Sequence, residues 1–165
     1  MDLYSRLIIK WDISNTMTSA WCKYVLSEAL EFHPTPDIFN TDQGSQFTSE
    51  AFTGLLEQHG IKISMDGKGS YNDNLFIERL WRSVKYEEVY LKAYQDSRES
   101  RLGIGNYFRF YNNERPHQAF DYRTPAEVYF AIKVEPTNRG MVESLIPGTL
   151  RTTVPVLNIP SILSN

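Results

Sequence analysis

The sequence predicts an α/β fold in which helices gather at the C-terminal side of a small sheet. Short stretches rich in β-branched residues alternate with amphipathic stretches over the first 65 residues, in the order strand, helix, strand, helix, strand. Later apolar residues recur at helical spacing only, up to about residue 132. The composition, 41% hydrophobic and 22% charged, is ordinary for a globular domain.

The first half of the chain is expected to contain three strands and two helices. Residues 7–13 are rich in β-branched residues, so a strand is predicted there, and Tyr4–Ile9 would continue a strand already under way at Met1. Apolar periodicity predicts helices from Thr16 or Thr18 to about Glu31 and from Ser49 to Gly60, with short strands at 37–40 and 62–64.

The second half is expected to be helical. A glycine-containing loop at 65–73 leads to a helix over about 74–90. Asp73 and Asn74 can cap the first amides of that helix. Further helices are predicted over about 96–112 and 125–132, with a turn at Arg115–His117 between them. Residues 132–165 have scattered aliphatics without a sustained period, and a poorly ordered tail is expected there.

Charge and cysteine content exclude several classes of protein. A net charge of −3 argues against a simple basic DNA-coating protein, although nine Lys/Arg against six Asp/Glu between Arg79 and Arg123 leave a local excess of +3. The single cysteine cannot form a disulfide within the chain, which fits a reducing cytosol. No apolar run approaches the roughly 20 residues that span a membrane. A cytoplasmic location is therefore expected.

Asp42 is the first candidate site residue, because it directly follows a predicted strand. Catalytic and ligand-binding groups of α/β sheets lie at strand ends, and Gly44 leaves room for a ligand beside the backbone. The alternative is structural: an aspartate at this position can open an Asx-turn. The residues alone leave both interpretations open.

Glu78 is the second candidate, one turn into the predicted 74–90 helix. Ile77, Leu80, Trp81 and Val84 form the apolar stripe, whereas Glu78, Arg82 and Lys85 form a second stripe about a quarter-turn away. The second stripe can be a solvated face on which Glu78 and Arg82 pair at i, i+4. It can equally place a metal-binding carboxylate beside two cations that contact phosphates.

Paired carboxylates on rigid elements suit metal-dependent phosphoryl transfer. Mg²⁺ prefers oxygen ligands and takes one or two carboxylates together with water and phosphate. Two such ions about 3.5–4 Å apart activate the attacking oxygen and stabilise the leaving oxygen. An aspartate at a strand end and a glutamate on a nearby helix can supply two ligands for this chemistry.

Three segments resemble the catalytic core of bacterial insertion-sequence transposases of the retroviral-integrase-like DDE type: NTDQGSQFTSEAF (40–52), ISMDGKGSYNDNLFIERLWRSVKYEEVY (63–90) and YFRFYNNERPHQAFDYRTPAEVY (107–129). Thirty-five residues separate Asp42 from Glu78, the spacing found in that family between the second and third acidic residues. The resemblance implies a ribonuclease-H-like integrase core over residues 1–131, and it has no counterpart for the 132–165 tail.

The resemblance also implies roles for single residues. Asp42 and Glu78 would be catalytic and bind Mg²⁺ (or Mn²⁺), and Lys85 matches a basic position implicated in DNA contact. Arg82 is expected to meet phosphates, while Gln43 and Gln46 can hydrogen-bond a base or sugar or else stabilise their loop. The implied partners are DNA at transposon ends and target sites, with full-length transposase or self-association as further possibilities and no membrane. Nucleoid association would follow.

The sequence departs from the family pattern at its front. The first catalytic aspartate of the family lies on the first strand, in a segment resembling W-x-x-D-x-T, which is expected to lie outside this chain. Asp2 then takes a structural position, and Asp12 is no replacement. The family activity is Mg²⁺-dependent DNA cleavage and transfer, but this chain is expected to be inactive alone. The alternatives are a non-catalytic fragment that binds DNA or transposase, and an inactive remnant.

Overall fold

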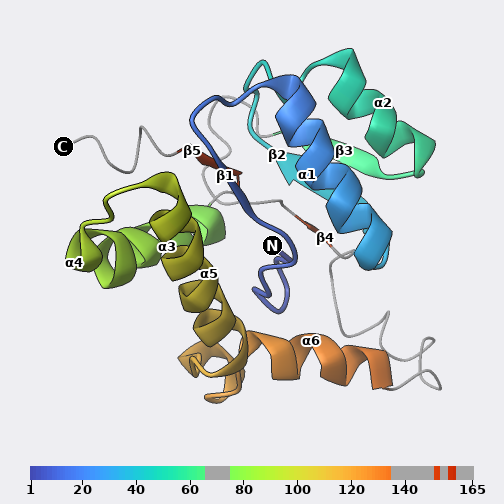
Figure 1. Cartoon of the computed structure of the whole chain (residues 1–165). Helices are drawn as coiled ribbons and strands as arrows, with labels where there is room; N and C mark the ends of the chain where they lie inside the picture. The colour runs from blue at the N-terminus through green and yellow to red at the C-terminus, as the bar shows by residue number, and fades with distance from the viewer. Residues whose placement is uncertain (66–74, 135–150, 153–155, 159–165) are drawn as a thin grey trace.

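A computed structural model describes residues 1–65, 75–134, 151–152 and 156–158. Helices dominate a mixed α/β arrangement (Figure 1). The elements run in the order β1 (Asp12–Ser14), α1 (Ser19–Phe32), β2 (Ile38–Thr41), α2 (Glu50–Gln58), β3 (Lys62–Met65), α3 (Leu75–Val84), a π-helical turn η1 (Lys85–Val89), α4 (Tyr90–Lys92), α5 (Ser97–Asn113), a 3₁₀ turn η2 (Gln118–Phe120), α6 (Pro125–Val134), β4 (Arg151–Thr152) and β5 (Val156–Asn158).

The parallel strand β2 lies at the centre of a three-stranded sheet in the order β3-β2-β4. Ile38 is in register with Lys62, and Thr41 with Met65. Phe39, Asn40 and Thr41 are all buried, as expected for a central parallel strand that is covered on both faces. This strand therefore holds its C-terminal end, where Asp42 follows, in a fixed position.

Helices α1 and α2 lie side by side and cover the sheet (Figure 1). The Thr18 hydroxyl accepts a hydrogen bond from the Trp21 amide at 3.3 Å, which confirms Thr18 as the N-cap of α1. The buried positions of α1 recur at i, i+3, i+4 and i+7, and they pack with Phe39 and Phe52 into one apolar cluster. The helix after Ser49 ends before Gly60, whose φ of 69° suits glycine.

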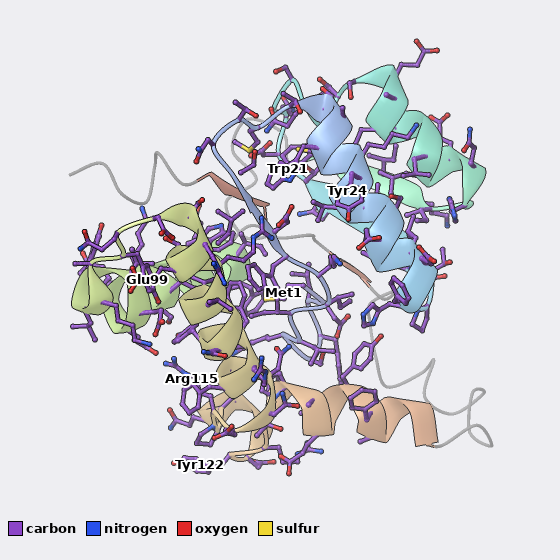
Figure 2. The ribbon with its side chains drawn as sticks, viewed as in Figure 1. Met1, Trp21, Tyr24, Glu99, Arg115 and Tyr122 are labelled. Atoms are coloured by element: carbon purple, nitrogen blue, oxygen red, sulfur yellow. The ribbon has the colours of Figure 1, made fainter. Side chains whose placement is uncertain are left out.

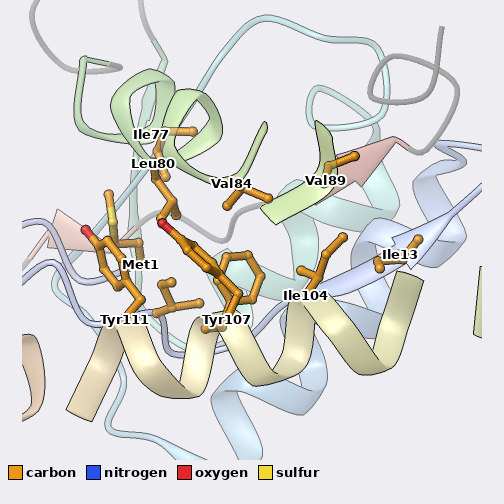
Figure 3. Packing of buried hydrophobic residues seen from close by; sticks show 11 residues of the cluster. Met1, Ile13, Ile77, Leu80, Val84, Val89, Ile104, Tyr107 and Tyr111 are labelled. Atoms are coloured by element: carbon orange, nitrogen blue, oxygen red, sulfur yellow. The ribbon is translucent and has the colours of Figure 1, made fainter. Parts of the chain in front are cut away.

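A second apolar cluster joins α3, α5 and the N-terminal segment (Figure 3). Leu80 and Val84 of α3 face Ile104, Tyr107 and Phe108 of α5, and each of these side chains is at least nine-tenths buried. The predicted apolar stripe of the 74–90 helix is thus confirmed. Burying a Val, Leu, Ile or Phe side chain contributes about 1.5–3 kcal/mol, so this contact fixes the rotation of α3 about its axis.

The N-terminal segment differs from the sequence prediction. A strand was expected at 7–13, continuing from Tyr4–Ile9, but β1 begins only at Asp12, and residues 3–5 form a turn. The reason lies in α5. The Asn112 side chain accepts from the Ile8 amide at 2.9 Å and donates to the Ile8 carbonyl at 3.0 Å, so it takes the place of a neighbouring strand.

Asp2 has a structural role, as the family resemblance implies, and Asp12 also makes structural contacts. The buried Asp2 carboxylate accepts from the amide and the hydroxyl of Ser5 and closes the N-terminal turn. Asp12 accepts from Trp21 Nε1 at 2.8 Å and pairs with Arg101 of α5. Partial burial by itself raises the pKa of Asp12, but the hydrogen bonds from Trp21 and Arg101 outweigh it, and the pKa lies below its ordinary value of 3.8.

Parts of the predicted organisation lie outside the described residues. The predicted loop at 65–73 and the caps at Asp73 and Asn74 fall on the 66–74 gap. Within the predicted 132–165 tail, residues 151–152 pair with β2, and residues 156–158 pair with β1. The division at residue 131 stays a prediction. Of the helices that the structure describes, none is both long and apolar enough to cross a membrane.

The Asn112 side chain gives a first test of this architecture. In Asn112→Ala the amide and carbonyl of buried Ile8 lose their partners, which costs about 1–3 kcal/mol for each unsatisfied group. We expect the free energy of unfolding, measured in urea, to fall by about 2 kcal/mol or more. The neighbouring exposed Asn113 donates to the Arg109 carbonyl within its own helix, so Asn113→Ala is the matched control. Equal losses in both variants would contradict the account.

The lowered pKa of Asp12 predicts how the free energy of unfolding depends on pH. Its folded-state pKa is lowered, so its contribution is complete above pH 3.8 and is lost as the pH falls through the lower folded value. Urea unfolding between pH 6 and 2 should show that Asp12→Asn removes on the order of 1 kcal/mol near neutrality, allowing for solvent screening, and less at pH 2. Asp37→Asn, at an exposed position, serves as the control. A loss from Asp12→Asn that does not change with pH would count against the ion pair.

Candidate active site

Asp42 lies where the sequence predicts, at the C-terminal end of the central strand β2. Its side chain is exposed, and one carboxylate oxygen, Oδ1, accepts from the Gly44 amide at 2.8 Å. This is the Asx-turn that the structural interpretation expects. The turn orients the carboxylate, and Asp42 forms no ion pair with any described residue. The structural and functional interpretations are therefore compatible.

The loop after Asp42 brings one of the two predicted glutamines beside it. A Cβ at Gly44 would lie 2.9 Å from Asp42 Oδ1 and 2.5 Å from Gln46 Nε2, so the carboxylate and the amide flank the glycine closely. A side chain at Gly44 would push them apart. Gln46 also donates to Met17 Sδ at 3.8 Å, which anchors the loop toward the start of α1. Gln43 is exposed to solvent.

Glu78 lies in the first turn of α3 and is exposed, as are its neighbours Arg79 and Arg82. The stripe of Glu78, Arg82 and Lys85 faces away from the apolar cluster, and Lys85 at its end is partly buried. The sequence allowed a Glu78–Arg82 ion pair at i, i+4. That pair does not form among the described residues, so the Glu78 carboxylate is not neutralised by its own helix.

The π-helical turn η1 follows directly and begins at Lys85. Such a turn inserts an extra residue into the helix. Its buried carboxylate, Glu88, accepts from the Tyr94 hydroxyl and pairs with Lys92 Nζ at 2.8 Å. Burial and this carboxylate raise the pKa of Tyr94. Glu88 is therefore satisfied internally, and it is not a free ligand for a metal ion.

The donor chemistry of Asp42 and Glu78 fits a hard divalent cation. Both present exposed carboxylate oxygens, Asp42 from the turn directly after β2 and Glu78 from α3, and neither is held in an ion pair with a described residue. Within the ranges that the structure describes, there is no group of three or more His, Cys, Asp or Glu side chains that could hold a metal ion. Two carboxylates, completed by water and a substrate phosphate, remain within what Mg²⁺ accepts.

Two family models match this chain, and both are described as the integrase core domain. One matches residues 1–70 and the other residues 59–125. Together they span strands β2 and β3, the Asp42 loop, α3 and α5.

Insertion-sequence transposases are its relatives in sequence. The transposase for insertion sequence element IS904 of Lactococcus lactis is 32% identical over 130 residues, which is 77% of this chain and 51% of that protein. The putative transposase InsK for IS150 of Escherichia coli is 28% identical over 130 residues, 77% of this chain and 46% of that protein. The chain spans about half the length of the curated relatives it matches.

Retroviral integrase catalytic cores share its fold. The core domain of BIV integrase superposes with a TM-score of 0.56 at 20% identity, covering 72% of this chain and 75% of that one. The HTLV-2 integrase core, solved in complex with magnesium, gives a TM-score of 0.52 at 19% identity, covering 68% and 70%. The sequence prediction of a ribonuclease-H-like fold is confirmed. The chain belongs to the integrase core family and is a relative of the bacterial insertion-sequence transposases.

Proposed function

We propose that this chain is the part of a transposase catalytic core that supplies Asp42 and Glu78 as metal ligands and holds DNA along α3. The observation that carries the proposal is the placement of Asp42. Within an integrase fold, it follows the central parallel strand, where α/β sheets bind their ligands. Glu78 follows on an exposed helix face with no ion-pair partner among the described residues.

In this chemistry, the protein would orient the two carboxylates. The Gly44 amide holds Asp42 Oδ1, which would leave Oδ2 as the oxygen that binds a cation. Helix α3 holds Glu78 because Ile77 and Leu80, on either side in sequence, are buried. Bound Mg²⁺ or Mn²⁺ would supply activation of a water or DNA 3′-hydroxyl and stabilisation of the leaving oxygen. The magnesium in the related HTLV-2 core supports this choice of ion.

Two cations, Arg82 of α3 and Lys85 at the start of η1, would position the DNA. Arg82 is exposed four residues after Glu78, and Lys85 follows three residues later on the same face. Contacts from Arg and Lys to phosphates fix the register of DNA without reading its sequence. Gln43 and Gln46, in the Asp42 loop, would hydrogen-bond a base or sugar. Binding to DNA in this way would also account for association with the nucleoid.

A DNA-binding measurement tests this proposal. The double variant Arg82→Gln, Lys85→Gln removes two phosphate contacts. Each contact contributes about −0.9 to the slope of log K against log salt concentration, so we expect the slope to become shallower by roughly 2. Fluorescence anisotropy with a labelled duplex that carries a transposon end would measure it.

The matched control also removes two cations. Arg98 and Arg109 are exposed on α5, and Arg98→Gln, Arg109→Gln changes net charge by the same amount. The proposal expects little change in the slope for this control. If both double variants weaken binding equally, DNA affinity depends on the overall charge of the chain and not on the face of Arg82 and Lys85. The proposed orientation of the DNA is then wrong.

A further inference from the structure

A cationic pocket lies on a different flank of α3 from the Glu78 stripe. It has a volume of about 240 Å³ and is formed by α3, the segment after α5 and the N-terminal turn. Its lining includes Arg6, Arg79, Arg115, His117, Phe76 and Tyr111. Figure 2 shows Arg115 near the lower end of α5, and Tyr111 projects from the same helix in Figure 3. None of the described residues that line this pocket is an aspartate or a glutamate.

Arg6 is held in this pocket by an unusual backbone conformation. Its φ of 61° is left-handed, which costs roughly 1–2 kcal/mol for a residue with a side chain. The Asp2–Ser5 hydrogen bonds and a 2.8 Å bond from the Asp2 amide to the Leu7 carbonyl maintain the turn. The Arg6 guanidinium then lies between two rings, 4.7 Å from the centre of Phe76 and 4.9 Å from that of Phe120.

The positive charge of the pocket is only partly neutralised. Arg115 is paired with Glu87, to which its Nη2 donates at 2.8 Å, and its other terminal nitrogen donates to Tyr107 Oη at 2.9 Å. Arg6 and Arg79 form no ion pair with any described residue. Burial lowers the pKa of Arg6, Tyr111 partly offsets this effect and Arg79 adds to it, but a guanidinium stays charged at neutral pH. Two like charges share one pocket.

His117 adds a polar atom without a partner. Its Nε2 is buried and has no hydrogen-bond partner among the described residues. The ring is fixed by its neighbours, stacked on Phe120 at 5.7 Å and edge-on to Tyr111 at 5.0 Å. Burial lowers the pKa of His117, and Arg6 and Arg115 lower it further. A buried polar atom of this kind costs free energy unless a ligand or water satisfies it.

We propose that this pocket binds a phosphate group, held by the guanidinium groups of Arg6 and Arg79 with His117 Nε2 as a third donor. A phosphate oxyanion neutralises both unpaired arginines and satisfies the histidine nitrogen at once. The group comes from the backbone of DNA or from free phosphate. The DNA source rests on the proposed function.

The bound phosphate would not be the one that reacts. Successive residues of an α-helix are about 100° apart, so the flank of Phe76, Arg79 and Ser83 is rotated by roughly 130° from that of Glu78, Arg82 and Lys85. The pocket would thus fix the DNA at a second point, beside the candidate active site.

The first experiment titrates the chain with inorganic phosphate and follows the His117 imidazole signals by NMR. We expect a saturable shift and a rise in the pKa of His117, because the anion offsets the repulsion from Arg6 and Arg115. Arg6→Gln and Arg79→Gln should each reduce the affinity at least tenfold. Arg109→Gln, an exposed charge outside the pocket lining, should leave it unchanged.

The choice of variants separates a loss of phosphate binding from a loss of folding. Arg6 carries ring contacts, so Arg6→Gln could lower the thermal unfolding midpoint, whereas Arg79 is exposed and its replacement should not. Arg79→Gln therefore decides the matter if Arg6→Gln is unstable. The proposal is overturned if Arg79→Gln binds phosphate with the same affinity as the wild-type chain and Arg109→Gln. It is also overturned if phosphate does not shift the His117 signals.

The second experiment identifies the source of the phosphate with a duplex in place of inorganic phosphate. A slope of log K against log salt that is shallower by about 0.9 in Arg79→Gln than in Arg109→Gln assigns the pocket to the DNA backbone. Equal slopes, with phosphate binding retained, assign it to free phosphate. If the wild-type chain binds no duplex at all, the proposed function fails, and the inorganic phosphate titration still decides the pocket.

Discussion

The packing of α3 against α5 is the contact on which the other features of the chain depend. Leu80 and Val84 are almost fully buried against Phe108 and its neighbours, so α3 cannot turn about its axis without exposing apolar surface. The rotation of α3 about its axis determines where each of its other side chains points. It presents Glu78 to solvent on one side and turns Arg79 toward the cationic pocket on another. A catalytic carboxylate needs a rigid support of this kind, because small displacements of reacting groups cost rate.

Polar contacts from α5 also hold parts of the chain that are distant from it in the sequence. Asn112 holds the backbone of Ile8, and Arg101 holds Asp12 and the carbonyl of Ile13, so α5 fixes the N-terminal segment that supplies Arg6. Tyr107 donates to Glu87 at 2.8 Å and links the same helix to the π-helical turn. The candidate active site and the cationic pocket thus share one scaffold, although they lie on different flanks of α3.

Local signals in the sequence predict much of this fold. The Thr18 cap and the apolar stripe through Leu80 are each encoded within a few residues, and both are found as expected. The strand predicted at 7–13 forms only from Asp12, because the backbone of Ile8 is paired with the side chain of Asn112, 104 residues away in the sequence. For the same reason the sequence does not reveal the cationic pocket. Arg6 and Arg79 come together only in space, and no spacing rule connects an arginine in a left-handed turn with one on a later helix.

Strand-end placement, helix periodicity and family resemblance predict Asp42 and Glu78, and the structure places Asp42 directly after β2 and Glu78 on α3. The central claim is that these two carboxylates bind the same divalent ions. A crystal soaked in Mn²⁺ tests it most directly through anomalous scattering. The account predicts a peak about 2 Å from a carboxylate oxygen of Asp42 and of Glu78, whether one ion contacts both or two adjacent ions contact one each. A Mn²⁺ peak on other side chains, with neither Asp42 nor Glu78 in contact, would contradict it.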